Sequence, residues 1–231
     1  MGTIGLIGGM SWESTLEYYR LINQGVGSRL GGLHSARCLL YSVDFAEIER
    51  LQTAGDWDAT ATILADAAVR LERGGADFIV LCTNTMHIVA DAITAAVSVP
   101  LLHIADATAN AIRAAGVGTV GLLGTRFTME QEFYLGRLRA THGLTVVIPE
   151  ESDRELVHSV IYGELCRGEI RSQSRTAYVA VIDRLAASGA EAIILGCTEI
   201  GLLIRPADSP LPIFDTTRIH AEAAVERALS R

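Results

Sequence analysis

Two apolar runs end in short polar segments that could carry proton-transfer chemistry. Residues 78–81 lead into Cys82-Thr83-Asn84-Thr85, and residues 192–195 lead into Gly196-Cys197-Thr198-Glu199. A thiol at the start of a helix has a pKa below its usual value of about 8.5, which makes it a base or nucleophile near neutral pH. Cys197 fits that description, although most free cysteines are simply small buried apolar residues. A threonine hydroxyl such as that of Thr83 is a weak base, but it can supply a proton.

Backbone amides in the same two segments could bind an anion. The first N–H groups of a helix and the positive end of its dipole attract carboxylates. Asn84, Thr85 and Thr198 are small polar residues of the kind that cap helices, and we expect them to supply these donors. Cys82 is a rival thiol, but it ends the apolar run and fits an inward-facing strand residue.

An internal repeat relates the two segments. Three stretches of the first half recur in the same order in the second: 4–9 in 120–125, 75–81 in 189–195, and 100–103 in 212–215. The offsets are 116, 114 and 112 residues. This alignment places Leu81 opposite Leu195, and therefore Thr83 opposite Cys197.

The elements around these segments predict an α/β fold with two pseudo-symmetric lobes. Short apolar runs alternate with longer helical patterns, which is typical of parallel strands joined by helices. We expect each lobe to be a short parallel sheet flanked by helices, with the active site in the cleft between the lobes at the carboxyl ends of the strands. The predicted lobes are residues 1–103 with 212–231, and residues 104–211.

Composition excludes several classes of chemistry. All nineteen basic residues are Arg, so reactions that need a lysine amine, such as a pyridoxal phosphate Schiff base or a Walker A loop, are ruled out. The net charge of -8 argues against nucleic-acid binding. The chain has no G-x-G-x-x-G motif, and its histidines lack metal-ligand spacing. We therefore expect no cofactor and no metal. With no apolar run of membrane-spanning length, no signal-peptide pattern and four scattered cysteines, we expect a cytoplasmic protein without a membrane contact.

Four motifs together resemble the aspartate/glutamate racemase superfamily along essentially the whole chain. They are Gly8-Gly9-Met10-Ser11, Thr83-Asn84-Thr85-Met86-His87, Gly196-Cys197-Thr198-Glu199 and Phe214-Asp215-Thr216. The resemblance implies a two-lobed racemase that needs no cofactor and often forms homodimers. In that family two cysteines on opposite faces of the substrate remove and return the α-proton.

The first motif departs from the family pattern, which is Cys-Asn-Thr-x-His. Thr83 occupies the position of the first catalytic cysteine, as the internal repeat also indicates. The pair Thr83 and Cys197 resembles that of racemases which prefer L-aspartate or L-glutamate. On this interpretation Cys197 takes the proton of the L-enantiomer and Thr83 supplies one to the opposite face. A shift of one residue in the alignment would instead restore a pair of cysteines through Cys82.

Further residues are expected to bind an acidic amino acid. Met10 and Thr125 follow the two glycine turns and would line the floor of the cleft, and Gln52 or Arg50 would reach in from the loop at residues 48–52. The resemblance adds Glu199 to the substrate-binding set. It also places Cys166 where aspartate-specific relatives have a Lys. Arg126 is a weaker candidate that fits a surface residue slightly better, and His87 could either orient a ligand or serve packing.

Two alternatives keep the same residues but change the function. Related lyases and isomerases use one cysteine at this site, and a lone thiol would suit them. A non-catalytic protein whose two lobes close on an amino acid is the other alternative. Failure to exchange the α-proton of any bound ligand would favour it.

Overall fold

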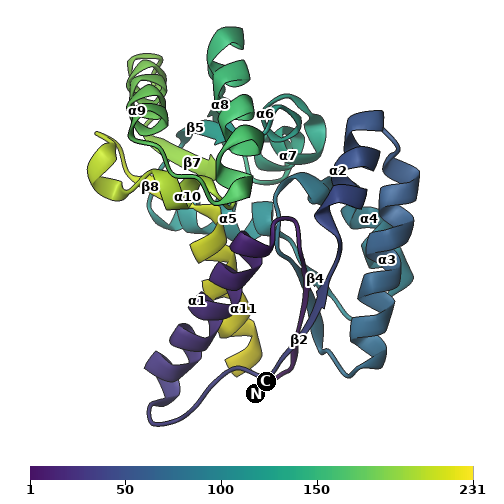
Figure 1. Cartoon of the computed structure of the whole chain (residues 1–231). Coiled ribbons are helices and arrows are strands. Elements are labelled where there is room, and N and C mark those ends of the chain that lie inside the picture. The colour runs from purple at the N-terminus through teal and green to yellow at the C-terminus, as the bar shows by residue number, and fades with distance from the viewer. Residues whose placement is uncertain (231) are drawn as a thin grey trace. The chain divides into compact units, whose positions relative to one another are not determined.

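The computed structural model describes residues 1–230, which divide into two compact α/β units (Figure 1). Unit 1 runs from Met1 to His103 and includes the chain from His220 onward, and unit 2 runs from Ile104 to Ile219. The second boundary falls inside the last helix, α11 (Thr216–Leu229).

Unit 1 is built on a parallel sheet with the strand order β2-β1-β3-β4. Its strands are β1 (Ile4–Gly8), β2 (Cys38–Ser42), β3 (Phe78–Leu81) and β4 (Leu101–Leu102). β1 lies between β2 and β3, with Ile7 opposite Leu81. The turns that follow β1 and β3 therefore leave the sheet at the same edge, which we call its carboxyl edge.

Helices cover both faces of this sheet, as Figure 1 shows for α1 and α3. They are α1 (Trp12–Leu30), α2 (Phe45–Ala54), α3 (Trp57–Arg73), the 3₁₀ segment η1 (Thr85–Val89), α4 (Ala90–Ala96) and the later part of α11. Side chains alternate along each strand. Phe78, Val80 and Cys82 pack with α1 and α11, whereas Ile79 and Leu81 pack with α2, α3 and α4.

Unit 2 repeats this design with the order β6-β5-β7-β8. Its strands are β5 (Thr119–Gly124), β6 (Thr145–Val147), β7 (Ala192–Gly196) and β8 (Ile213–Asp215). Its helices are α5 (Ile104–Ala114), α6 (Arg126–Glu130), α7 (Glu132–Gly136), α8 (Glu151–Gly163), α9 (Ser172–Ala187) and α10 (Ile200–Leu203). Shorter segments are the π-helical η2 (Arg137–Thr141) and the 3₁₀ turns η3 (Leu165–Arg167) and η4 (Pro206–Asp208).

The two sheets correspond strand for strand, which confirms the predicted α/β fold and the repeat behind it. Ile7 pairs with Leu81 in unit 1, and Leu123 pairs with Leu195 in unit 2. Aligning these pairs makes Thr83 and Cys197 equivalent, because each is the second residue after the aligned leucine.

The unit boundaries differ from the predicted ones at residues 212–219. Residues 212–231 were predicted to belong to the first lobe, but residues 212–219 belong to unit 2 because β8 pairs with β7. Only the part of α11 from His220 onward packs in unit 1, where Ala221, Ala224 and Val225 join the core.

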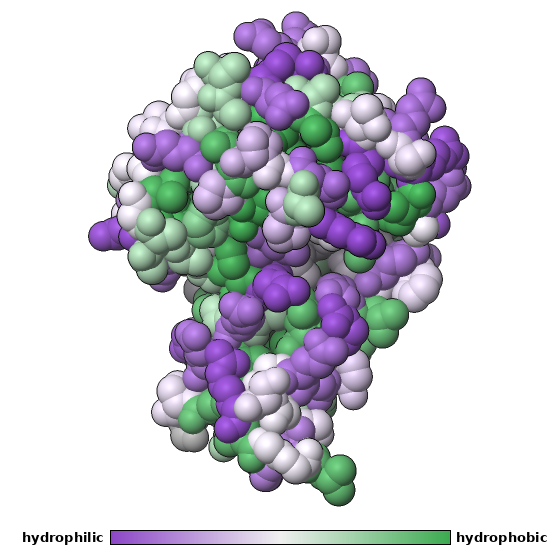
Figure 2. All heavy atoms as spheres, turned by 90° about the vertical axis from the view of Figure 1, so that its left-hand side faces the viewer, coloured by the Kyte–Doolittle hydropathy of each residue, from purple (hydrophilic) through white to green (hydrophobic). Residues whose placement is uncertain are grey.

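Among the described residues, no helix is both long and apolar enough to cross a membrane. The face drawn in Figure 2 mixes hydrophilic with hydrophobic residues.

Candidate functional site

The turn after β3 places Thr83 at the carboxyl edge of the unit 1 sheet. The N–H of Cys82 donates to the carbonyl of Ile7 at 2.9 Å, which extends the ladder one residue beyond the strand. The N–H of Thr83 then turns back to the carbonyl of Leu81, also at 2.9 Å. Thr83 is buried. The sheet ladder thus ends at Cys82, and Thr83 is the first residue of the turn.

Cys82 belongs to the core. Its side chain is fully buried in the cluster that joins Phe78 and Val80 to α1 and α11. Burial among these apolar groups raises the pKa of the Cys82 thiol far above its ordinary value. This environment suits an inert packing residue, so the structural contrast between Cys82 and Thr83 agrees with the repeat.

The turn after β1 is shaped by Gly9, whose φ of 94° is a left-handed conformation that favours glycine. A Cβ at this position would stand 2.3 Å from the carbonyl oxygen of Val43. The N–H of Gly9 donates to Oγ1 of Thr15 at 2.8 Å, which ties the turn to the first helical turns of α1. Met10 follows and is buried in the cluster with Ile48.

The other candidates in unit 1 are also buried. Asn84 and Thr85 lie at the start of η1, and Gln52 lies in α2, whereas Arg50 is exposed. The expected helix cap is absent, because Asn84 precedes a 3₁₀ segment and its side chain makes no capping hydrogen bond. The α-helix itself begins only at Ala90.

In unit 2 the thiol of Cys197 is paired with a carboxylate. Its Sγ donates to Oε2 of Glu199 at 2.9 Å, and Oγ1 of Thr198 donates to the same oxygen at 2.8 Å. All three residues are buried. Thr198 and Glu199 were both predicted to bind substrate, and Thr198 also to cap a helix; in the structure their side chains bond to one another, and that of Glu199 bonds to Cys197 as well. The sequence signal for the pairing of Cys197 with Glu199 was the position of this carboxylate two residues after the cysteine.

The pKa of Cys197 is raised, the opposite of the expected direction. Burial is the largest cause, and the nearby Glu199 carboxylate disfavours the thiolate further. The expectation relied on a helix dipole, but α10 has only four residues and starts at Ile200. A helix this short has little dipole to offset burial.

Threonines at the start of α11, directly after β8, form hydrogen bonds to the backbone on both sides of Cys197. Oγ1 of Thr216 donates to the carbonyl of Leu195 at 2.7 Å, and Oγ1 of Thr217 reaches the carbonyl of Thr198 at 3.5 Å. Oδ1 of Asp215 accepts from the N–H groups of Thr217 and Arg218, so it caps α11. This role of Asp215 was not predicted, although Asp-Thr-Thr before a helical pattern is a recognisable cap signal.

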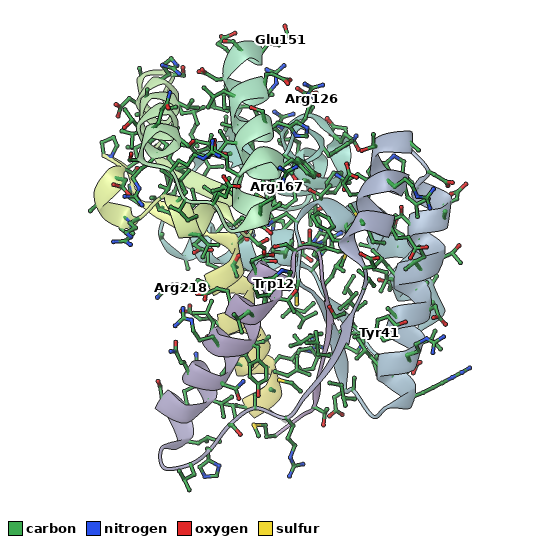
Figure 3. The ribbon with its side chains drawn as sticks, viewed as in Figure 1. Trp12, Tyr41, Arg126, Glu151, Arg167 and Arg218 are labelled. Carbon is green, nitrogen blue, oxygen red and sulfur yellow. The ribbon has the colours of Figure 1, made fainter. Side chains whose placement is uncertain are left out.

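Thr125 and Arg126 follow β5, the neighbour of β7. Thr125 is buried and caps α6, since its Oγ1 accepts from the N–H of Thr128 at 3.2 Å. Arg126, labelled in Figure 3, is half exposed and forms an ion pair with Glu155 of α8. It therefore has the character of a surface residue. Because β5 and β7 pair through Gly124 and Gly196, Thr125 and Cys197 leave the same edge of the unit 2 sheet.

The structure thus gathers the predicted residues into two groups, one in each unit. Unit 1 carries five of them: Met10 follows β1, Thr83, Asn84 and Thr85 follow β3, and Gln52 lies in α2. Unit 2 carries Thr125, Cys197, Thr198 and Glu199. Within residues 1–230, no three or more His, Cys, Asp or Glu side chains are grouped so that they could hold a metal ion.

Comparison with known proteins supplies the family. Residues 7–224 match the Asp/Glu/Hydantoin racemase family. A crystal structure of a candidate Asp/Glu racemase from Yersinia pestis is 58% identical, with a TM-score of 0.92 over 99% of this chain and 100% of that one. An aspartate racemase homologue from Pyrococcus horikoshii OT3 is 35% identical, with a TM-score of 0.85 over the same shares. The broad specificity amino-acid racemase RacX of Bacillus subtilis (strain 168) is 29% identical over 76% of this chain and 75% of its own length. The chain therefore belongs to the Asp/Glu/Hydantoin racemase family and is an isomerase.

Proposed function

We propose that this enzyme is a cofactor-independent racemase for acidic amino acids, with L-aspartate or L-glutamate as its substrate. Cys197 would remove the α-proton and Thr83 would deliver one to the opposite face. The coarser part, a racemase of the Asp/Glu/Hydantoin family, is established by the family match. The choice of an acidic L-amino acid and the roles of Cys197 and Thr83 rest on the candidate residues of unit 1 and unit 2.

One observation carries the proposal: Thr83 and Cys197 occupy equivalent places in two equivalent sheets. Each lies two residues beyond the paired leucine of its strand. Inversion at a carbon requires proton transfer on two opposite faces, and a duplicated unit supplies two such groups from the same structural position. The difference between a hydroxyl and a thiol makes the two transfers chemically unequal.

Glu199 supports the role of Cys197 as the base. Since burial and the adjacent carboxylate raise the pKa of Cys197, the resting group is a thiol. The thiol proton points at Oε2 of Glu199 over 2.9 Å, so the carboxylate can accept it and leave a thiolate. That thiolate takes the α-proton of the L-acid. Glu199 then releases its proton to solvent.

Thr83 completes the reaction on the other face. Its hydroxyl gives a proton to the carbanion, which yields the D-enantiomer, and it recovers a proton from water. Because a hydroxyl is a far weaker base than a thiolate, abstraction from a D-acid should be slower than from an L-acid. This asymmetry is the basis for assigning an L-substrate.

Recognition of a dicarboxylate must rely on amides, hydroxyls or arginine, since the chain has no lysine. Asn84, Thr85, Thr125 and Thr198 are the buried candidates. The names of two of the similar proteins, an aspartate racemase homologue and an Asp/Glu racemase candidate, favour acidic substrates, and RacX is named for broad specificity. None of the four cysteines, all of which lie in the described part of the chain, forms a disulfide, which fits the proposed cytoplasmic location.

The test is solvent deuterium exchange at the α-carbon, read by proton NMR. The purified enzyme would be incubated in D₂O with L- and D-aspartate and L- and D-glutamate, without added cofactor. We expect exchange of an L-acid together with appearance of the deuterated D-product, and loss of both in Cys197→Ser. The matched control is Cys38→Ser, which removes a half-buried thiol of β2 in unit 1 and should remain active. Exchange without a D-product would favour a lyase or isomerase, and no exchange with any of the four acids would refute the assignment.

A further inference from the structure

His87 holds the carbonyl of Thr83 through its imidazole ring. Nδ1 of His87 lies 2.8 Å from that carbonyl oxygen, and the ring is buried within η1. A carbonyl oxygen can only accept, so Nδ1 must carry the hydrogen. The bond therefore fixes both the tautomer of His87 and the plane of the peptide that joins Thr83 to Asn84.

The local backbone explains why a side chain makes this bond. In an α-helix the N–H of His87 would donate to the carbonyl four residues earlier, that of Thr83. Here the segment is a 3₁₀ turn, and the N–H of His87 donates to the carbonyl of Asn84 at 3.1 Å. The imidazole N–H replaces the backbone donor at the carbonyl of Thr83.

The ring of His87 is itself held by two other imidazoles of unit 1. The His103 ring lies 4.4 Å from it and the His220 ring 6.0 Å, both measured between centroids. His220 is fixed at both nitrogens: Nε2 donates to the carbonyl of Leu102 at 2.9 Å, and Nδ1 accepts from the hydroxyl of Tyr18 at 2.8 Å. These contacts tie the ring of His87 to α1, β4 and α11.

Unit 2, all of whose residues are described, has no imidazole bond to the carbonyl of Cys197, the residue equivalent to Thr83. Because Leu81 corresponds to Leu195, His87 corresponds to Gly201, which has no side chain to offer. The carbonyl of Cys197 accepts instead from the backbone N–H of Ile200 at 3.1 Å. The imidazole bond is therefore specific to the turn that carries Thr83.

We propose that His87 is a positioning residue for Thr83: its Nδ1–H holds the turn so that the Thr83 hydroxyl can deliver a proton to the substrate carbanion. The inference rests on the proposed racemase function. It predicts that loss of the Nδ1 donor impairs the step at Thr83 and leaves the step at Cys197 intact.

Two reactions of L-substrates separate these steps. Racemisation of L-aspartate needs Cys197 to remove the proton and Thr83 to return one. L-threo-3-chloroaspartate needs only the first step, because its carbanion expels chloride as the Cα=Cβ bond forms. The resulting enamine tautomerises to an imine, and water hydrolyses it to oxaloacetate and ammonium. D-aspartate is measured by chiral chromatography and oxaloacetate by its reduction with NADH and malate dehydrogenase.

His87→Leu removes the donor with little change of volume, and His87→Asn keeps an N–H near the position of Nδ1. We expect His87→Leu to lower the rate of racemisation about tenfold or more, since small misplacements of a reacting group cost factors of this order. Chloride elimination should stay near the wild-type rate. His87→Asn should restore most of the racemisation, and Thr83→Ala should reproduce the pattern of His87→Leu.

The outcomes separate the inference from the function on which it rests. If the wild type racemises neither aspartate nor glutamate, the proposed function fails. If the wild type racemises aspartate and eliminates chloride, and His87→Leu lowers the two rates equally, the residue is merely structural and the inference is overturned. Unchanged racemisation in His87→Leu, or no recovery in His87→Asn, would overturn it as well. Elimination serves as the internal measure of correctly folded enzyme in each variant.

Discussion

Sγ of Cys197 and Oε2 of Glu199 lie 2.9 Å apart, and the thiol donates to the carboxylate. Oγ1 of Thr198 donates to the same oxygen, so that one carboxylate atom serves two donors. Burial and the charge of Glu199 keep the thiol protonated at rest by raising the pKa of Cys197. The same carboxylate accepts the hydrogen bond of the thiol, so in the proposed mechanism Glu199 disfavours the thiolate at rest and also takes the thiol proton.

Glu199→Gln should separate these two effects. The amide has no negative charge, so the pKa of the Cys197 thiol should fall, because a charge that disfavours the thiolate is gone. The rate of racemisation should nevertheless fall by about 10² or more, the usual contribution of a general base. Thiolate absorbance at 240 nm, titrated against pH and corrected with Cys197→Ser, measures the first effect, and steady-state kinetics measures the second.

Glu222→Gln is the matched control, since Glu222 is an exposed residue of α11. It should change neither the thiol titration nor the rate. A Glu199→Gln enzyme with wild-type kcat would show that the carboxylate does not take the thiol proton.

The sequence predicted the architecture because the fold is duplicated. Three matches in the same order aligned Leu81 with Leu195, and the strand pairings give the same alignment. The third match of the repeat could also have corrected the wrong assignment of residues 212–219 to the first lobe. It aligned 212–215 with 100–103, and since β4 pairs with β3, β8 must pair with β7.

Local chemistry was less predictable because it depends on burial and on the first turn after each strand. Small polar residues after a strand indicated helix caps, yet Asn84 starts a 3₁₀ turn and Thr198 donates to Glu199. The lowered pKa predicted for Cys197 assumed a full helix behind it, whereas α10 has four residues. Neither the length of that helix nor the burial of the thiol can be read from residue types.

Cys82→Ala should affect stability and leave catalysis unchanged. Its Sγ is packed among Phe78, Val80 and the residues of α1 and α11, so its removal leaves a small cavity. We expect the free energy of unfolding in urea to fall by about 1–2 kcal/mol. Racemisation should continue at the wild-type rate, in contrast to its loss in Thr83→Ala. A strong loss of activity in a folded Cys82→Ala enzyme would instead make Cys82 the second catalytic group.

Gly201→Ala should destabilise unit 2 near the thiol. A Cβ at this position would lie 2.7 Å from Oδ2 of Asp215, and this carboxylate cannot move freely because Oδ1 caps α11. We expect a loss of about 1–3 kcal/mol in the free energy of unfolding, typical of overpacking. Gly163→Ala is the control, since this helical glycine of α8 has open space around its Cβ position and should gain up to about 1 kcal/mol. Equal stabilities of the two variants would contradict the packing argument.

The stability of the protein should fall as the pH drops from about 6.5 towards 4 because of His220. Complete burial lowers the pKa of His220 to about 4, whereas the unfolded chain titrates near the ordinary value of 6.5. Between these values the unfolded state binds more protons than the folded state, so acid favours unfolding. His220 therefore contributes stability that is fully present above pH 6.5 and is lost as the pH falls towards 4. The full effect is on the order of 3 kcal/mol.

Urea unfolding of the wild type and of His220→Gln from pH 4.5 to 7.5 tests this linkage. Glutamine can place an N–H near the position of Nε2, so the bond to the carbonyl of Leu102 can form without a titrating group. The variant should therefore be less stable at pH 7.5, where the hydroxyl of Tyr18 loses its acceptor, and it should show a flatter dependence on pH below 6.5. Parallel curves for the two proteins would mean that another group, and not His220, sets the acid sensitivity.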